Sequence, residues 1–448
     1  MNATSSSTRQ ADRRQEESPN PMRQAPAKLY VETATQCNLA CPMCVKQSWG
    51  SDAAEGLLDP GIFEQVKPAF PYLDALILNG IGEPLLHPLL EKFIRDAKKA
   101  MRTGSWVGFQ SNGLLIDRDR ARSLVEAGLD KICISVDALS PQLYRAVRSG
   151  GELGSIEQAF FNLMSAQKSA SGSSLKVGIE FVVMQDNLLE LPGVIRWAAH
   201  HGATFAIVTH LLPYHETMVS HALYDANTDS ALELYRSWEE KAVKEGIDIY
   251  RYPNVYLKYE KNQRDQKVVD FIEAMKSDAV SKGVYLHLDK LLKRADVRVR
   301  EVMRLFEEAR AVADETGIDL RLPLAVPKSE RTCEFVEEGG AFISWDGKMH
   351  PCYFLWHRYQ CYIDGHKKFV APKVFGNLNG RGILDIWNST AYSHFRKNVL
   401  RYDYPYCFNC GFALCDYVQG EEFQQDCYTN TEPCGSCLWC MGVFHCLR

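Results

Sequence analysis

The sequence predicts an α/β protein with three parts: six βα units in a parallel sheet or barrel, a helical insertion, and a small cysteine-rich domain. Three observations support this prediction. Short β-rich segments alternate with helical segments over the first half of the chain. The 15 cysteines are unevenly placed, with three inside eight residues near the start and eight more between Cys407 and Cys446. The charged, helix-rich stretch between these regions predicts the insertion.

The predicted sheet rests on six β-rich segments separated by helical ones. Strands alternating with helices indicate βα units, which pair in parallel. Ligands of such folds bind at the carboxyl ends of the strands. The expected strands are Lys28–Thr33, Ala75–Leu78, Trp106–Gln110, Lys131–Val136, Lys176–Val183 and Thr204–Val208. The expected helices are Pro60–Pro68, Pro88–Ala100, Asp119–Ala127, Ile156–Gln167 and Leu188–His201.

Composition divides the chain into four ranges. Residues 1–27 are rich in Ser, Arg, Gln and Pro and are expected to be a disordered tail. The α/β core is placed at 28–213, the helical insertion at 214–325 and the cysteine-rich domain at 326–448. Within the insertion, Lys241–Pro253 and Arg310–Pro323 look alike, and each is expected to be a helix end, a glycine and a short strand.

The overall composition excludes several classes of protein. With 46% hydrophobic residues, 24% charged residues and a net charge of -5, the chain has the character of a globular protein with no nucleic-acid partner. No apolar run approaches the roughly 20 residues of a spanning helix, so we expect no membrane partner. The tail lacks the apolar middle of a secretory signal. An odd number of clustered cysteines favours metal ligation in the reducing cytoplasm over a disulfide scaffold.

The first cysteine group follows the first expected strand directly. Cys37, Cys41 and Cys44 have the spacing C-x3-C-x2-C. Thiolates hold iron–sulfur clusters, and three ligands leave the fourth iron of a [4Fe–4S] cluster open for chemistry. The alternative is a zinc site lacking its fourth ligand. Zinc usually takes paired C-x2-C units, and Cys133 is interpreted as an ordinary strand residue, so the spacing favours a cluster.

Polar or glycine-rich motifs follow three successive strands. The second strand leads into Asn79-Gly80-Ile81-Gly82-Glu83-Pro84, the third into Gln110-Ser111-Asn112-Gly113, and the fourth into Ser135-Val136-Asp137. Glycine lets a ligand approach the backbone closely, and Glu83 is expected to face a cationic group. Turn formation alone does not explain three such motifs one βα unit apart.

Together, C-x3-C-x2-C, G-E-P and the S-x-D strand end make residues 28–212 resemble the radical S-adenosylmethionine (SAM) superfamily. The resemblance implies a partial (β/α)6 TIM-like barrel, a SAM-binding [4Fe–4S] cluster and an electron donor such as ferredoxin or flavodoxin. It further implies that Cys37, Cys41 and Cys44 hold the cluster. The residues implied to contact SAM are Gly80, Gly82 and Glu83 at the amine, Asn112 in the pocket, Ser135 and Asp137 at the ribose, and Arg148 at the carboxylate.

Two residues depart from the family pattern without removing a ligand. Met43 stands where many members have an aromatic residue against the adenine, and its polarizable side chain can substitute. Ile81 interrupts the usual Gly-Gly-Glu-Pro.

The cysteines after residue 332 resemble the SPASM extension, which implies two auxiliary [4Fe–4S] clusters. Cys333, Gly347 and Cys352 fit its opening C-x13-G-x4-C, whereas the later spacing departs from it, and zinc at one site stays open. We interpret Cys361 as a packed thiol and Asp416 as a candidate catalytic base. The expected auxiliary ligands are Cys333, Cys352, Cys407, Cys410, Cys415, Cys427, Cys434, Cys437, Cys440 and Cys446.

The strings CNLACPMCVKQSW, HLLPY and CGSCLWCMG are similar to radical SAM maturases of tungsten-cofactor oxidoreductases. This resemblance implies reductive SAM cleavage to a 5′-deoxyadenosyl radical, hydrogen abstraction, and a client oxidoreductase or its tungstopterin cofactor. A peptide- or protein-modifying SPASM maturase is the first alternative. A non-catalytic iron–sulfur electron carrier and a zinc-dependent binding module are two others, although neither requires the strand-end motifs.

Overall fold

The computed structural model describes residues 23–48, 54–170, 172–293, 296–410 and 423–447. Its main sheet has ten strands in the order β12-β9-β8-β1-β2-β3-β4-β5-β6-β7. All six expected strands are present, and they pair in parallel in chain order, so the predicted parallel α/β core is confirmed. Their bounds are β1 Lys28–Val31, β2 Ala75–Ile77, β3 Trp106–Ser111, β4 Lys131–Ser135, β5 Lys176–Val183 and β6 Phe205–His210.

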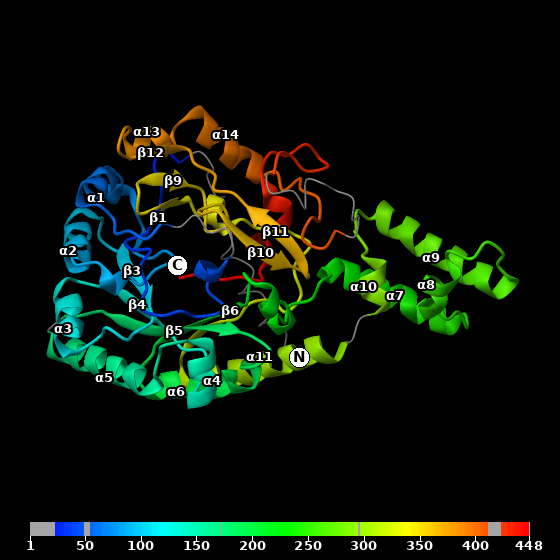
Figure 1. Cartoon of the computed structure of the whole chain (residues 1–448), viewed down its shortest axis with the longest axis horizontal. Coiled ribbons are helices and arrows are strands. Elements are labelled where there is room, and N and C mark those ends of the chain that lie inside the picture. The colour runs from blue at the N-terminus through cyan, green and yellow to red at the C-terminus, as the bar shows by residue number, and fades with distance from the viewer. Residues whose placement is uncertain (1–22, 49–53, 171, 294–295, 411–422, 448) are drawn as a thin grey trace, which may run out of the picture.

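Helices cover the outer face of this curved, open sheet, which forms a partial barrel (Figure 1). Their apolar residues recur at helical spacing and point inward, as Leu90, Phe93, Ile94 and Ala97 do in one of them. Asp117 caps another helix by accepting a hydrogen bond from the Arg120 N–H at 2.7 Å. The bounds are α1 Pro60–Val66, α2 Leu90–Ala100, α3 Arg118–Glu126, α4 Pro141–Val147, α5 Leu153–Ser169 and α6 Leu191–His200.

The expected helical insertion contains two different structures. Its first four helices form a lobe with a separate hydrophobic core that projects from the body (Figure 1). The last helix, α11 Asp296–Thr316, instead contributes Val302, Phe306 and Ala309 to the main core. It leads into β7 Asp319–Arg321, which pairs in parallel with β6. The lobe helices are α7 Asp229–Lys244, α8 Tyr252–Val255, α9 Gln263–Ser281 and α10 Leu288–Leu292.

The two similar segments of the insertion do not have the same structure, so the expectation for the first is wrong. Both have a left-handed glycine after their helix, Gly246 and Gly317. After Gly317 the chain forms strand β7 because it lies beside the open edge of β6. After Gly246, Ile249–Arg251 forms a 3-10 turn, and this segment pairs with none of the described strands.

The cysteine-rich region extends the same sheet on its other edge. Strand β8, Gly340–Ile343, pairs in parallel with β1, and β9, Lys348–His350, returns antiparallel beside it. Beyond them lie β12 Gly376–Asn377, the separate hairpin β10 Tyr359–Ile363 and β11 His366–Val370, and helices α12 Glu334–Glu337, α13 Ile383–Trp387 and α14 Thr390–Val399.

The last described residues run back into the barrel. The Leu324 N–H donates to the Gly442 carbonyl at 2.8 Å, and the His445 N–H donates to Thr209 Oγ1, on β6, at 3.1 Å. Leu447 is buried, and the end of the chain lies inside the curve of the sheet in Figure 1. This path brings Cys446 to the barrel interior.

Candidate active site

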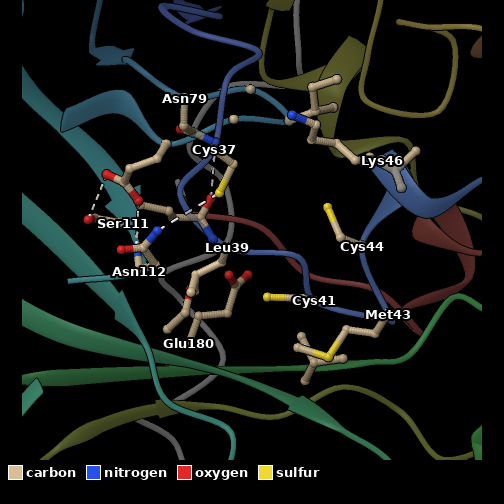
Figure 2. A pocket seen from close by; sticks show the side chains of 18 of the residues that line it. Cys37, Leu39, Cys41, Met43, Cys44, Lys46, Asn79, Ser111, Asn112 and Glu180 are labelled. Atoms are coloured by element: carbon tan, nitrogen blue, oxygen red, sulfur yellow. Dashed lines mark hydrogen bonds between the residues drawn. The ribbon is translucent and has the colours of Figure 1, made fainter. Parts of the chain in front are cut away.

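A cavity of about 310 Å³ opens at the carboxyl ends of the strands. Five parts of the chain supply its wall: the first cysteine loop, the ends of β2 to β5, the residue that follows α4, the segment after β6, and the cysteine-rich region. Figure 2 shows some of the side chains that line it. The lining residues include Cys37, Cys41, Met43, Cys44, Asn79, Gly80, Gly82, Glu83, Asn112, Ser135, Arg148, Glu180, Tyr214, Tyr353, Trp356, Trp439 and Cys446.

The first cysteine loop presents its three sulfur atoms to one side of this cavity (Figure 2). The loop is held by a hydrogen bond from the Cys44 N–H to the Cys41 carbonyl at 3.1 Å. Burial raises the pKa of the Cys41 thiol and raises the pKa of Cys44 to about 11. A bound cation is therefore needed to keep these sulfurs as thiolates at neutral pH.

The glycine loop after β2 lies directly on the cysteine loop. A Cβ at Gly82 would come within 2.4 Å of the Gln36 carbonyl oxygen, and one at Gly80 within 2.3 Å of the buried Glu32 side chain. The Glu83 N–H donates to the Gln36 carbonyl at 2.8 Å. Because Gln36 precedes Cys37, this contact sets the position of the first cysteine.

Glu83 lines the cavity, and its carboxylate is hydrogen-bonded within the protein. It is buried and accepts hydrogen bonds from Ser111 Oγ and the Asn112 N–H, both at 2.8 Å, and from the Leu85 N–H at 3.1 Å. Burial raises its pKa. Glu83 therefore joins the ends of β2 and β3 and positions the cavity wall.

Asn112, Ser135 and Arg148 line the cavity, as predicted, whereas Asp137 does not appear in its wall. Asn112 Nδ2 donates to Asn38 Oδ1 at 2.7 Å. The buried Asp137 carboxylate is engaged by Arg148 Nε and, at 2.7 Å, by the Val182 N–H. Asp137 therefore holds Arg148 in place instead of presenting a free carboxylate to a ribose.

Sequence reasoning missed Glu180, which lies on β5 and lines the cavity opposite the cysteine loop (Figure 2). Burial, together with the charge of Asp137, raises its pKa to about 7, against the opposing effect of Arg148. A single acidic residue near the carboxyl end of the apolar strand KVGIEFVV was the signal that could have found it.

The sequence also did not identify Tyr353 as a residue of the cavity wall. Its hydroxyl accepts a hydrogen bond from Asn79 Nδ2 at 2.9 Å. Tyr214, Trp356 and Trp439 also contribute to the cavity wall.

The later cysteines separate into groups. Five of them line a second, small cavity: Cys333, Cys352, Cys434, Cys437 and Cys440. Elsewhere, burial and the charges of Asp426, Cys427 and Cys410 raise the pKa of Cys407 to about 12, which places these three cysteines together. Cys415 and the suggested base Asp416 lie outside the described residues.

Cys446, an expected auxiliary ligand, is not one of the five cysteines around the second cavity. It lines the main cavity and is absent from the wall of the five-cysteine cavity. Cys133 and Cys361 are buried in strands, as expected for packed thiols.

Comparisons with known proteins agree with this geometry. Residues 31–179 match the model of the radical SAM superfamily, and residues 333–411 match that of SPASM, an iron–sulfur cluster-binding domain. A tungsten-containing aldehyde ferredoxin oxidoreductase cofactor-modifying protein of Pyrococcus furiosus is 28% identical over 93% of this chain and 96% of its own length. A probable GTP 3′,8-cyclase of Methanococcus aeolicus is 27% identical over 44% of this chain and 64% of its own.

Two solved structures resemble the chain at low identity. Streptococcus suis SuiB bound to S-adenosylmethionine has a TM-score of 0.49 and 12% identity, covering 87% of this chain and 71% of that one. Native anSMEcpe with bound AdoMet and the Cp18Cys peptide has a TM-score of 0.48 and 14% identity, covering 88% of each chain.

The chain belongs to the radical SAM superfamily and carries a SPASM domain. It is an iron–sulfur, SAM-dependent enzyme, with a [4Fe–4S] cluster and SAM as cofactors and auxiliary iron–sulfur clusters in the SPASM domain. The donor set suits this chemistry, since three thiols and a glycine cradle share one cavity. Among the described residues, no group of three or more His, Cys, Asp or Glu side chains is arranged to hold a single metal ion. No described helix is long and apolar enough to cross a membrane.

Proposed function

We propose that this enzyme reductively cleaves SAM to a 5′-deoxyadenosyl radical, abstracts a hydrogen from its substrate, and thereby serves the maturation of a tungsten oxidoreductase or its cofactor. The observation that carries the proposal is that Cys37, Cys41 and Cys44 line a single cavity together with Ser135 and Arg148. The similarity to the Pyrococcus furiosus cofactor-modifying protein over 93% of the chain supports the client class.

In this proposal the three cysteines of the first loop hold the SAM-binding cluster, which supplies the electron that breaks a carbon–sulfur bond of SAM. The backbone of Gly80 to Glu83 receives the SAM amine, and Ser135 and Asn112 bind polar groups of the nucleoside. Arg148 Nε is occupied by Asp137, so the rest of its guanidinium serves the SAM carboxylate. A ferredoxin or flavodoxin delivers the electron.

We also propose ligands for the auxiliary clusters. Four of the five cysteines around the second cavity bind one cluster: Cys333, Cys352, Cys434 and Cys437, with Cys440 as the remaining thiol. Cys407, Cys410 and Cys427 bind the other with Cys415 as the expected fourth ligand.

Anaerobic reconstitution with iron and sulfide, reduction with dithionite and addition of SAM test the reaction. We expect 5′-deoxyadenosine by liquid chromatography from the wild type and none from Cys41→Ala. Cys361→Ala is the matched control, because that thiol is buried in β10 away from the cavity. Iron binding and SAM binding without 5′-deoxyadenosine, in the presence of a tungsten oxidoreductase client, would contradict the proposal and favour an electron carrier.

The client is tested separately. Wild-type enzyme, reductant and SAM are incubated with an aldehyde-oxidising tungsten enzyme made in cells that lack this protein, and the extracted cofactor is compared by mass before and after. A mass change that requires Cys41 supports the proposal. An unchanged cofactor and an unchanged client protein, together with modification of a peptide substrate, would support the peptide-maturase alternative instead.

A further inference from the structure

Cys446 lies on the wall of the active-site cavity and is absent from the wall of the five-cysteine cavity. Its position follows from the path of the final segment, which the His445 N–H fixes on β6 through Thr209. The neighbours that act on its thiol include the indole of Trp439 and the carboxylate of Glu180. Tyr353, another wall residue, also lies within electrostatic reach of the sulfur.

Two residues that line the same cavity have a buried polar atom with no hydrogen-bond partner among the described residues. The Trp356 indole N–H and the Asn79 side-chain oxygen are buried and have no hydrogen-bond partner among the described residues. Both residues line the cavity, and Trp356 is more than nine-tenths buried. Because unpaired buried polar groups are costly, this wall is suited to a polar ligand. The ligand that satisfies these atoms would lie on the same wall as the thiol.

We propose that Cys446 is a catalytic residue that donates a hydrogen atom to the carbon-centred radical formed in this cavity. The inference rests on the proposed SAM cleavage and adds the step that ends the radical. Burial raises the pKa of Cys446 to about 12, so the sulfur carries its hydrogen at neutral pH. A thiol S–H bond is weaker than the C–H bonds of most substrates, so transfer to carbon is downhill.

The step balances with groups placed nearby. The C–H bond forms as the S–H bond breaks, which leaves a neutral thiyl radical on Cys446. One electron from a reduced iron–sulfur cluster and one proton restore the thiol. Glu180 can supply the proton, because burial and the nearby charge of Asp137 raise its pKa to about 7.

Trp439 provides the structural link for that electron. Its ring lines both the active-site cavity and the five-cysteine cavity. Trp439 therefore borders both the cavity that Cys446 lines and the cavity of the proposed auxiliary cluster. In this proposal Cys446 is a hydrogen-atom donor and not a cluster ligand.

The test uses the reconstituted enzyme with SAM and dithionite in D2O, without added substrate. The thiol hydrogen exchanges with solvent, so a deoxyadenosyl radical that reaches Cys446 acquires deuterium. We expect wild-type 5′-deoxyadenosine to gain one mass unit, and we expect Cys361→Ser to behave identically. In Cys446→Ala and Cys446→Ser the gain should disappear, because neither an alkyl C–H nor an O–H bond offers an exchangeable, weakly bound hydrogen.

Iron content and the cluster spectrum provide a second measurement that does not depend on turnover. Both should be unchanged in Cys446→Ser, since the thiol is not a ligand. A loss of iron in that variant overturns the inference, as does deuterium gain that persists without Cys446. Unlabelled 5′-deoxyadenosine from the wild type overturns this inference alone, whereas absence of 5′-deoxyadenosine, even with the client present, overturns the proposed function as well.

Discussion

Gly82 provides the sharpest test of how the two loops of the active site depend on each other. In Gly82→Ala the new Cβ would lie 2.4 Å from the Gln36 carbonyl oxygen and 2.5 Å from that of Ala34. Carbon–oxygen contacts in proteins seldom fall below about 3.3 Å. Both oxygens belong to backbone that the Glu83 N–H and strand β1 hold in place, so rotation of a side chain cannot relieve the contact.

The size of the effect follows from the displacement required. The loops must separate by roughly 0.9 Å to restore an ordinary contact distance. Overpacking of this kind costs about 1–3 kcal/mol of stability. Since Cys37 follows Gln36 directly, the first cysteine moves as well, and a misplacement of about 1 Å in an active site can cost roughly 100-fold in rate.

We therefore expect Gly82→Ala to form 5′-deoxyadenosine roughly 100-fold more slowly than the wild type, with a lowered thermal midpoint. Gly154→Ala is the matched control, because a Cβ there meets nothing within 4 Å. It should leave both measurements unchanged. A Gly82→Ala enzyme that keeps its iron and cleaves SAM at the wild-type rate would refute the reasoning.

Three further substitutions test the wall. Glu83→Gln places an amide N–H where the Glu83 carboxylate accepts hydrogen bonds from Ser111 and Asn112. Chemical denaturation should show that the free energy of unfolding falls by about 1–3 kcal/mol. An unchanged denaturation midpoint would contradict this prediction. Asp137→Ala leaves Arg148 unpaired and should cost about 3–5 kcal/mol and weaken SAM binding, measured by calorimetry. Folding raises the pKa of Glu180 from 4.5 to about 7. The contribution of its carboxyl group to the free energy of unfolding therefore falls as the pH rises between these two values. Glu180→Gln should therefore become more stable relative to the wild type between pH 5 and pH 8, and parallel stability curves would exclude the shift.

The barrel could be predicted from the sequence because its signals are local. Each strand of the core is a short apolar run bounded by polar or turn residues, and the loop motifs follow the strands at one end. The pairing of β8 with β1 was not predictable in this way. Lys28 pairs with Gly340, although most of the chain lies between them in the sequence. The residues of the strand GAFI do not indicate which strand it pairs with.

In the active site, too, local sequence motifs could be predicted, whereas features that depend on tertiary contacts could not. The spacing of the three cysteines predicted a cluster, whereas the predicted roles of Gly82 and Arg148 came from the family resemblance. For Glu83 the residue type was informative but its direction was not, since burial against β3 decides what its carboxylate meets. Cys446 illustrates the limit of cysteine counting, because only the folded path of the final segment separates it from the thiols around the second cavity.

The shared sheet has a mechanical consequence. Because β8 is hydrogen-bonded to β1 along its length, the regions that match two different family models cannot swing apart like domains on a linker. The buried contact between His357 and Glu32, at 3.0 Å, ties them again beside the glycine loop. The distance for electron transfer between their cofactors would then be fixed, and no domain closure would be required. Thermal denaturation would unfold both regions in one transition.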